Sequence, residues 1–90
     1  MFSSKKEESF AKGGHTLFDQ SLEIDGQVRF SGTLDVEGTV NGDISALEGS
    51  DAMVRIRDNG CVNGEIRAPK VIINGRVNGD VYATTHLELA

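Results

Sequence analysis

The side chains of this sequence that could do chemistry are two histidines, one cysteine and several carboxylates. His15, Cys61 and His86 lie far apart along the chain, and no nucleophile, base and carboxylate are gathered around any of them. Nucleophilic catalysis needs such a set at hydrogen-bonding distance. We therefore interpret both histidines as surface residues and Cys61 as a small residue of a wall.

The acidic residues recur at alternating positions, together with the other polar residues, and not at the spacing of a metal or ligand site. Two of them across a groove could act as general acid and base, but a solvated wall is the simpler interpretation. The outward-facing acids are predicted to be Asp25, Asp35, Glu37, Asp43, Glu65 and Asp80. Zinc sets, calcium-binding repeats, P-loops and dinucleotide fingerprints do not occur. The sequence therefore predicts no enzyme activity and no catalytic, cofactor, nucleotide or metal site.

The charge of the chain argues against a nucleic-acid partner. Its formal net charge is −5, whereas nucleic-acid-binding domains are usually basic. The lysines near the start are not followed by the apolar segment of a signal peptide. The longest aliphatic run, residues 71–73, is far too short to cross a bilayer. A cytoplasmic chain is the interpretation that fits, and a single cysteine agrees with a reducing compartment.

A period of two dominates the middle of the chain. Every even position from Leu22 to Ile44 is aliphatic, Phe or Gly, and every odd position between them is polar. Such alternation predicts extended chain with one buried face, but single strands rarely exceed about ten residues. Gly26, Gly32 and Gly38 recur every six residues and can bend the chain at little steric cost. Short strands that bend and keep one face inward wind into a solenoid.

The repeats give the circumference of that solenoid. The pentapeptides VNGDI, VNGEI and VNGDV begin at residues 40, 62 and 77. Successive coils begin at matching positions, which are Leu34, Val54, Val71 and Leu87. These positions lie 20, 17 and 16 residues apart. The pattern contains an insertion at 46–53 and a phase shift at 68–70. That spacing predicts coils with three short sides. An antiparallel meander built on the Asn-Gly pairs is the competing interpretation, although some pairs are only four residues apart.

We therefore expect an all-β, three-sided parallel β-helix of about four coils over residues 16–90, after a flexible leader over residues 1–15. Its core is a column of stacked aliphatic residues, and its open ends must be capped or joined to another chain. The residues predicted for the ends, as a polymerisation interface, are Leu17, Phe18, Leu87 and Leu89. Ile72 and Tyr82 are predicted to form an outward patch on one wall, for lateral or partner contacts.

Three segments together support a family resemblance. They read SLEIDGQVRFSGTLDVEGTVNGDI, VRIRDNGCVNGEIRAPKVIINGRVNGDVYATTHLEL and, at the start, MFSSKK. This order of repeats, with its irregular coil lengths and the Ala-Pro before Val71, resembles the bactofilins, bacterial polymer-forming cytoskeletal proteins. The resemblance covers about residues 16–90, and it implies that the last coils that family members usually carry are missing from this sequence.

The resemblance implies a right-handed coil that assembles end to end with itself into nucleotide-independent filaments. It implies a scaffold for cell-wall remodelling enzymes or cell shape, at the inner face of the cytoplasmic membrane. The residues that match the family's membrane-targeting start are Met1, Phe2, Lys5 and Lys6. Burial of the Phe2 ring and attraction of the two lysines to anionic headgroups would both favour binding to the membrane.

A second function from another class shares the six-residue rhythm. Acyltransferases of the hexapeptide type wind a left-handed β-helix with very regular coils and place a catalytic histidine between subunits. The variable coil lengths and the lack of a visible pocket for His86 disfavour that alternative.

Overall fold

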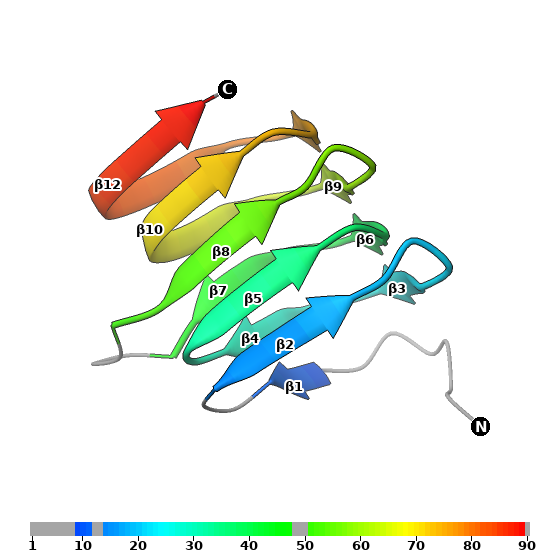
Figure 1. The fold of residues 1–90 in the computed structure, drawn as a ribbon, viewed down its shortest axis with the longest axis horizontal. Coiled ribbons are helices and arrows are strands. Elements are labelled where there is room, and N and C mark those ends of the chain that lie inside the picture. Colours follow the sequence, from blue (N-terminus) through cyan, green and yellow to red (C-terminus); the bar gives the residue numbers. More distant parts are fainter. Residues whose placement is uncertain (1–8, 12–13, 48–50, 90) are drawn as a thin grey trace.

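The computed structural model describes residues 9–11, 14–47 and 51–89, and the described chain is a right-handed parallel β-helix with three walls (Figure 1). All strand pairs are parallel. No helix occurs in these ranges. The right-handed sense of the coil contradicts the left-handed alternative as a fold. The predicted all-β solenoid of about four coils is confirmed.

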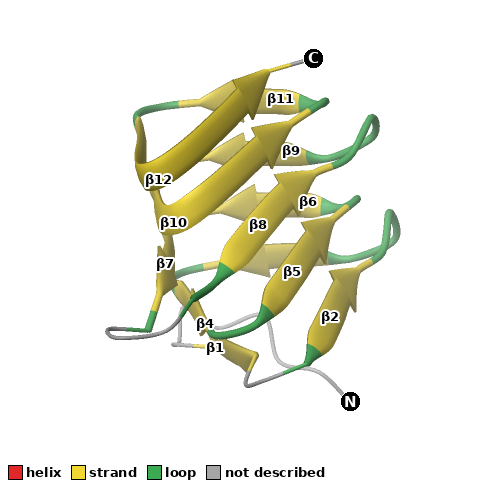
Figure 2. Ribbon diagram, turned by 60° about the vertical axis from the view of Figure 1, so that its left-hand side comes forward, coloured by secondary structure: helices red, strands yellow, loops and turns green. Residues whose placement is uncertain are grey.

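Each wall is a stack of strands from successive coils (Figure 2). Wall A consists of β2 (His15–Phe18), β5 (Thr33–Val36), β8 (Met53–Ile56) and the second halves of β10 (Ile66–Ile73) and β12 (Val81–Leu89). Wall B consists of β3 (Glu23–Asp25), β6 (Thr39–Asn41), β9 (Cys61–Asn63) and β11 (Arg76–Asn78). Wall C consists of β1 (Ser9–Ala11), β4 (Val28–Phe30), β7 (Ile44–Ala46) and the first halves of β10 and β12.

The core is a column in which inward residues of one coil lie over those of the next. Leu34, Val54 and Val71 are register partners on wall A, and all three are fully buried. The predicted even parity is confirmed from Ile24 to Ile44. The buried apolar residues are Ile24, Val28, Phe30, Leu34, Val36, Val40, Ile44, Ala52, Val54, Ile56, Val62, Ile66, Ala68 and Val71. A 90-residue chain thus builds a continuous core without a globular shape.

The phase shift after Ala68 is confirmed, but its cause differs from a simple break between strands. β10 and β12 each run around the corner between walls C and A, and their register shifts between Ala68 and Lys70. Pro69 lies at this irregularity, where a missing backbone donor costs least. The two last coils therefore turn this corner within a single strand.

The Asn-Gly pairs at the corner between walls B and C serve two separate purposes. Gly42, Gly64 and Gly79 have φ of 152°, 155° and 150°, and a Cβ on each would lie about 2 Å from the carbonyl oxygen of the glycine one coil below. On the outer surface, Asn78 Nδ2 donates to Asn63 Oδ1 at 2.7 Å, and Asn63 Nδ2 donates to Asn41 Oδ1 at 2.8 Å. Glycine permits the close stacking of the coils, and the asparagines form a hydrogen-bonded ladder along it.

Part of the predicted leader forms a strand. Ser9–Ala11, within the predicted flexible leader, form β1 and pair with β4, and β2 already begins at His15. Ser9–Ala11 therefore add a strand beneath the first complete coil on wall C.

Candidate functional site

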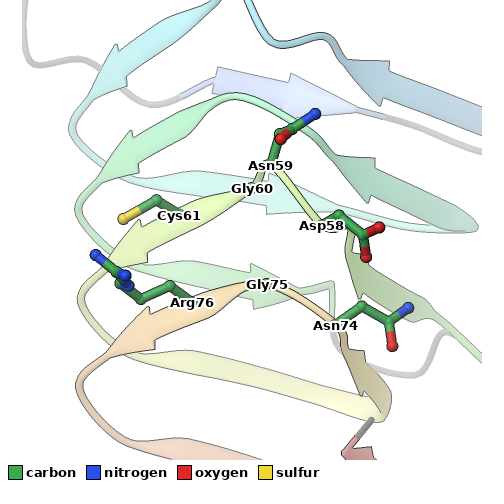
Figure 3. Close-up of a pocket in the computed structure, with 7 residues that line it drawn as sticks. All are labelled: Asp58, Asn59, Gly60, Cys61, Asn74, Gly75 and Arg76. Carbon is green, nitrogen blue, oxygen red and sulfur yellow. The ribbon is translucent and has the colours of Figure 1, made fainter.

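An open polar pocket of about 350 Å³ lies at the corner between walls A and B (Figure 3). Two successive turns form it, and its lining residues are Asp58, Asn59, Gly60, Cys61, Asn74, Gly75 and Arg76. Cys61 and Arg76 lie next to each other as register partners, whereas Asp58 and Asn74 lie at the other end (Figure 3). Since the lining contains no histidine and Asp58 lies away from the thiol, the pocket offers polar contacts but no nucleophile–base pair.

The candidate catalytic residues do not come together. His86 contacts Glu88 at 3.2 Å on the exposed last strand. His15 contacts Asp35 on the first coil. Cys61 is half-buried on wall B, and its Sγ lies 3.9 Å from Asn63 Oδ1. Within residues 9–11, 14–47 and 51–89, no group of three or more His, Cys, Asp or Glu residues could hold a metal ion.

Asp35 contradicts its predicted place on a solvated wall, because only 3% of it is exposed. Its side chain does point outward on wall A, but two neighbours cover it. Arg55, its register partner, donates from Nε to Oδ1 at 2.6 Å and from a terminal nitrogen to Oδ2 at 2.9 Å. His15 contacts the same Oδ2 from the coil below. The cluster of Asp35, Arg55 and His15 ties the first three strands of wall A together.

The Asp35 cluster was missed in the sequence, although a signal for it was present. Asp35 and Arg55 are 20 residues apart, the same separation as Leu34 and Val54. Coil length alone thus places the acid beside the arginine. What the spacing does not give is the burial, because that depends on how the Arg55 side chain lies over the carboxylate.

The Asp35 cluster predicts acid sensitivity. Burial raises the pKa of Asp35, but hydrogen bonds from Arg55 and His15 and their charges outweigh it, so the pKa lies below its ordinary value. A lowered pKa contributes stability above the unfolded pKa of about 4, and this stability is lost as pH falls through the folded value. We expect the free energy of unfolding to fall below pH of about 4, with a shallower fall in Asp35→Asn.

Urea unfolding at a series of pH values measures this effect. Asp19→Asn is the control, because hydrogen bonds from Ser21 also lower the pKa of Asp19 but its carboxylate is exposed. A pH profile of Asp35→Asn parallel to that of the original chain would contradict the prediction.

The predicted end residues are placed differently at the two ends. At the last coil, Leu87 and Leu89 are register partners of Val71 and Ile73, and they are 47% and 69% exposed because the described chain has no strand above them. At the first coil, Phe18 packs against the core. Leu17 is the register partner of Asp35, so it points outward and is 53% exposed. The even parity that starts at Leu22 extends back to Thr16 and Phe18, which leaves Leu17 outside.

The predicted patch of Ile72 and Tyr82 does not form on one wall. Ile72 is the register partner of Arg55 on wall A, whereas Tyr82 is the register partner of Arg67 on wall C. The corner within β10 and β12 separates them. The prediction of a shared patch is therefore wrong, and each residue belongs to its own surface.

The residues predicted to target the membrane, Met1, Phe2, Lys5 and Lys6, lie outside the described residues. In the described ranges, no helix is both long and apolar enough to span a membrane.

Comparison with known proteins identifies a family and one curated relative. The Bactofilin family, described as polymer-forming cytoskeletal, matches residues 16–90. Bactofilin BacO of Myxococcus xanthus (strain DK1622) is 33% identical over 75 residues, which are 83% of this chain and 56% of BacO. The chain thus spans little more than half the length of this curated relative, and no solved structure matched it. The chain belongs to the bactofilin family of polymer-forming cytoskeletal proteins.

Proposed function

We propose that the chain is a non-enzymatic scaffold that assembles end to end into filaments without nucleotide. The observation that carries this proposal is the open end of the core column. Leu87 and Leu89 continue the inward column of wall A, yet they remain exposed on the last described strand. Exposed strand edges and apolar faces favour addition of another strand. A neighbouring copy that stacks on this end would extend both the core and the hydrogen-bond ladder.

The other end offers a complementary starting point. Phe18 and the outward Leu17 lie on β2, whose outer edge pairs with no strand in the described part of the chain. β3 on wall B has an edge of the same kind. Contacts at both ends are needed for a filament, because one type of contact alone can close into a dimer.

The proposed cellular role follows from the family and from the start of the chain. Met1, Phe2, Lys5 and Lys6 are the residues that we propose as a membrane hook at the inner face of the cytoplasmic membrane. One hook of this size binds weakly, but a filament that displays many of them binds through avidity. Filaments held at the membrane could organise cell-wall remodelling enzymes or cell shape.

The test of assembly is electron microscopy of the purified chain without nucleotide, together with sedimentation at several concentrations. We expect thin filaments for the original chain and loss of filaments for Leu89→Lys, because a charge would be buried in the end contact. The matched control is Glu88→Lys, which places lysine on the neighbouring exposed position of the same strand, on the outer face of wall A.

Three results would contradict the proposal. If Leu89→Lys formed filaments like those of the original chain, the last coil would not take part in the end-to-end contact. A monomer at every concentration would show that the chain does not assemble by itself. A compact trimer that turns over acetyl-CoA would favour the acyltransferase alternative.

A further inference from the structure

Wall C differs from the other walls in the charge of its outer surface. β4 and β7 turn their first and third residues inward and their middle residue outward, as Val28, Arg29 and Phe30 show. The outward column in register is Arg29, Ser45, Arg67 and Tyr82. In this column the described chain has two basic residues and no acidic one.

The outer surfaces of the other two walls carry both signs. Wall B presents Glu23 and Asp25 with Arg76. Wall A presents Lys70 and Glu88 in addition to the Asp35 cluster. Among the described residues, wall C is therefore the wall that suits an anionic surface.

Tyr82 gives wall C an interfacial character as well as a basic one. The ring is 44% exposed, and the guanidinium of Arg67 lies 4.4 Å from its centroid. Arg67 also donates a hydrogen bond to Glu65 at 2.8 Å. Glu65 belongs to an acidic corner, formed with Asp43 and Asp80, that borders this wall. Arginine beside an exposed tyrosine is typical of surfaces at lipid headgroups.

The position of β1 relates this wall to the start of the chain. β1 pairs with β4, and Phe10 is the register partner of Arg29. Ser9 pairs with Val28 at the start of β4, so the described chain enters wall C at its corner with wall B, one residue before the level of Arg29.

We propose that wall C is the surface that lies on the membrane, with Arg29, Arg67 and Tyr82 in contact with anionic lipid headgroups. This inference rests on the proposed membrane association and adds the orientation of the solenoid. Each arginine near an anionic leaflet contributes about a fivefold gain in binding at low salt, and salt screens it. In a filament these contacts repeat along one side.

Vesicles of phosphatidylglycerol and phosphatidylcholine provide the first test, by co-sedimentation of the full chain at low salt. We expect the double variant Arg29→Gln and Arg67→Gln to bind about 25-fold more weakly. The control, Arg57→Gln with Arg76→Gln, removes the same charge from exposed positions away from wall C, and we expect a loss of less than about threefold.

Tyrosine fluorescence provides an independent readout, because the chain contains one Tyr and no Trp. We expect anionic vesicles, but not vesicles of phosphatidylcholine alone, to protect Tyr82 from quenching by acrylamide. Protection of Tyr82 together with a larger loss in the wall C variant supports the orientation.

The possible failures can be told apart. If the original chain does not bind anionic vesicles, the proposed membrane association is overturned together with the orientation. If the original chain binds but both double variants lose the same affinity for vesicles, only the orientation is overturned. The same holds if vesicles do not protect Tyr82 from acrylamide. An undiminished affinity of the wall C variant for anionic vesicles would overturn wall C as the surface that contacts lipid.

Discussion

Gly64→Ala is expected to lower the free energy of unfolding by about 4 kcal/mol. Gly64 has φ of 155°, and an added Cβ would lie 2.1 Å from the carbonyl oxygen of Gly42. Backbone cannot move aside as a flexible side chain can, and the same corner stacks on Gly79 above. The coils must therefore separate locally, which weakens both the core column and the asparagine ladder.

Gly14→Ala is the matched control for this substitution. Gly14 also has a positive φ, 57°, but nothing lies within 4 Å of an added Cβ. We expect it to cost only about 1 kcal/mol, the strain of a left-handed alanine. Urea unfolding followed by circular dichroism measures both. Equal losses in the two variants would contradict the close stacking at the Gly64 corner.

Arg55→Leu is expected to lower the free energy of unfolding by about 2 to 3 kcal/mol, because it leaves the buried carboxylate of Asp35 without its main partner. The value is at the low end for a broken buried ion pair because a third of the Arg55 side chain is exposed and solvent screens the pair. His15 contacts Asp35 from the first coil but does not replace both bonds of the guanidinium.

The double variant Arg55→Leu with Asp35→Leu separates this cause from a loss of packing. We expect it to recover most of the stability, since apolar side chains can replace a buried ion pair with little net cost. Arg76→Leu, on the exposed surface of wall B, should change stability by less than about 0.5 kcal/mol. A double variant as unstable as Arg55→Leu alone would show that the carboxylate is not the source of the loss.

The glycine corner and the Asp35 cluster would have different roles in a scaffold. The glycine corner acts between every pair of neighbouring coils, so its loss divides the stack. The Asp35 cluster acts at the first coils only, where it fastens β2 to β5 and β8. A filament that joins copies through this end would depend on that fastening, whereas the last coil depends on Leu87 and Leu89.

The sequence by itself determined the period, the parity and the coil lengths. Alternation in a strand is a local property, so the inward residues from Ile24 to Ile44 could be read directly. The resemblance to bactofilins gave the handedness and the family. Residue types misled where one type broke the parity: Thr16 points inward and Leu17 outward, against their hydrophobicity.

The tertiary structure decided how the side chains of different coils contact one another. Asp35 and Arg55 become partners when β8 stacks on β5, and the asparagine ladder forms when three corners stack in register. Ile72 and Tyr82 separate because β10 and β12 turn a corner that the alternation of residues does not locate. Burial of a carboxylate and the charge of a wall depend on side chains from several coils at once, and no local pattern contains that information.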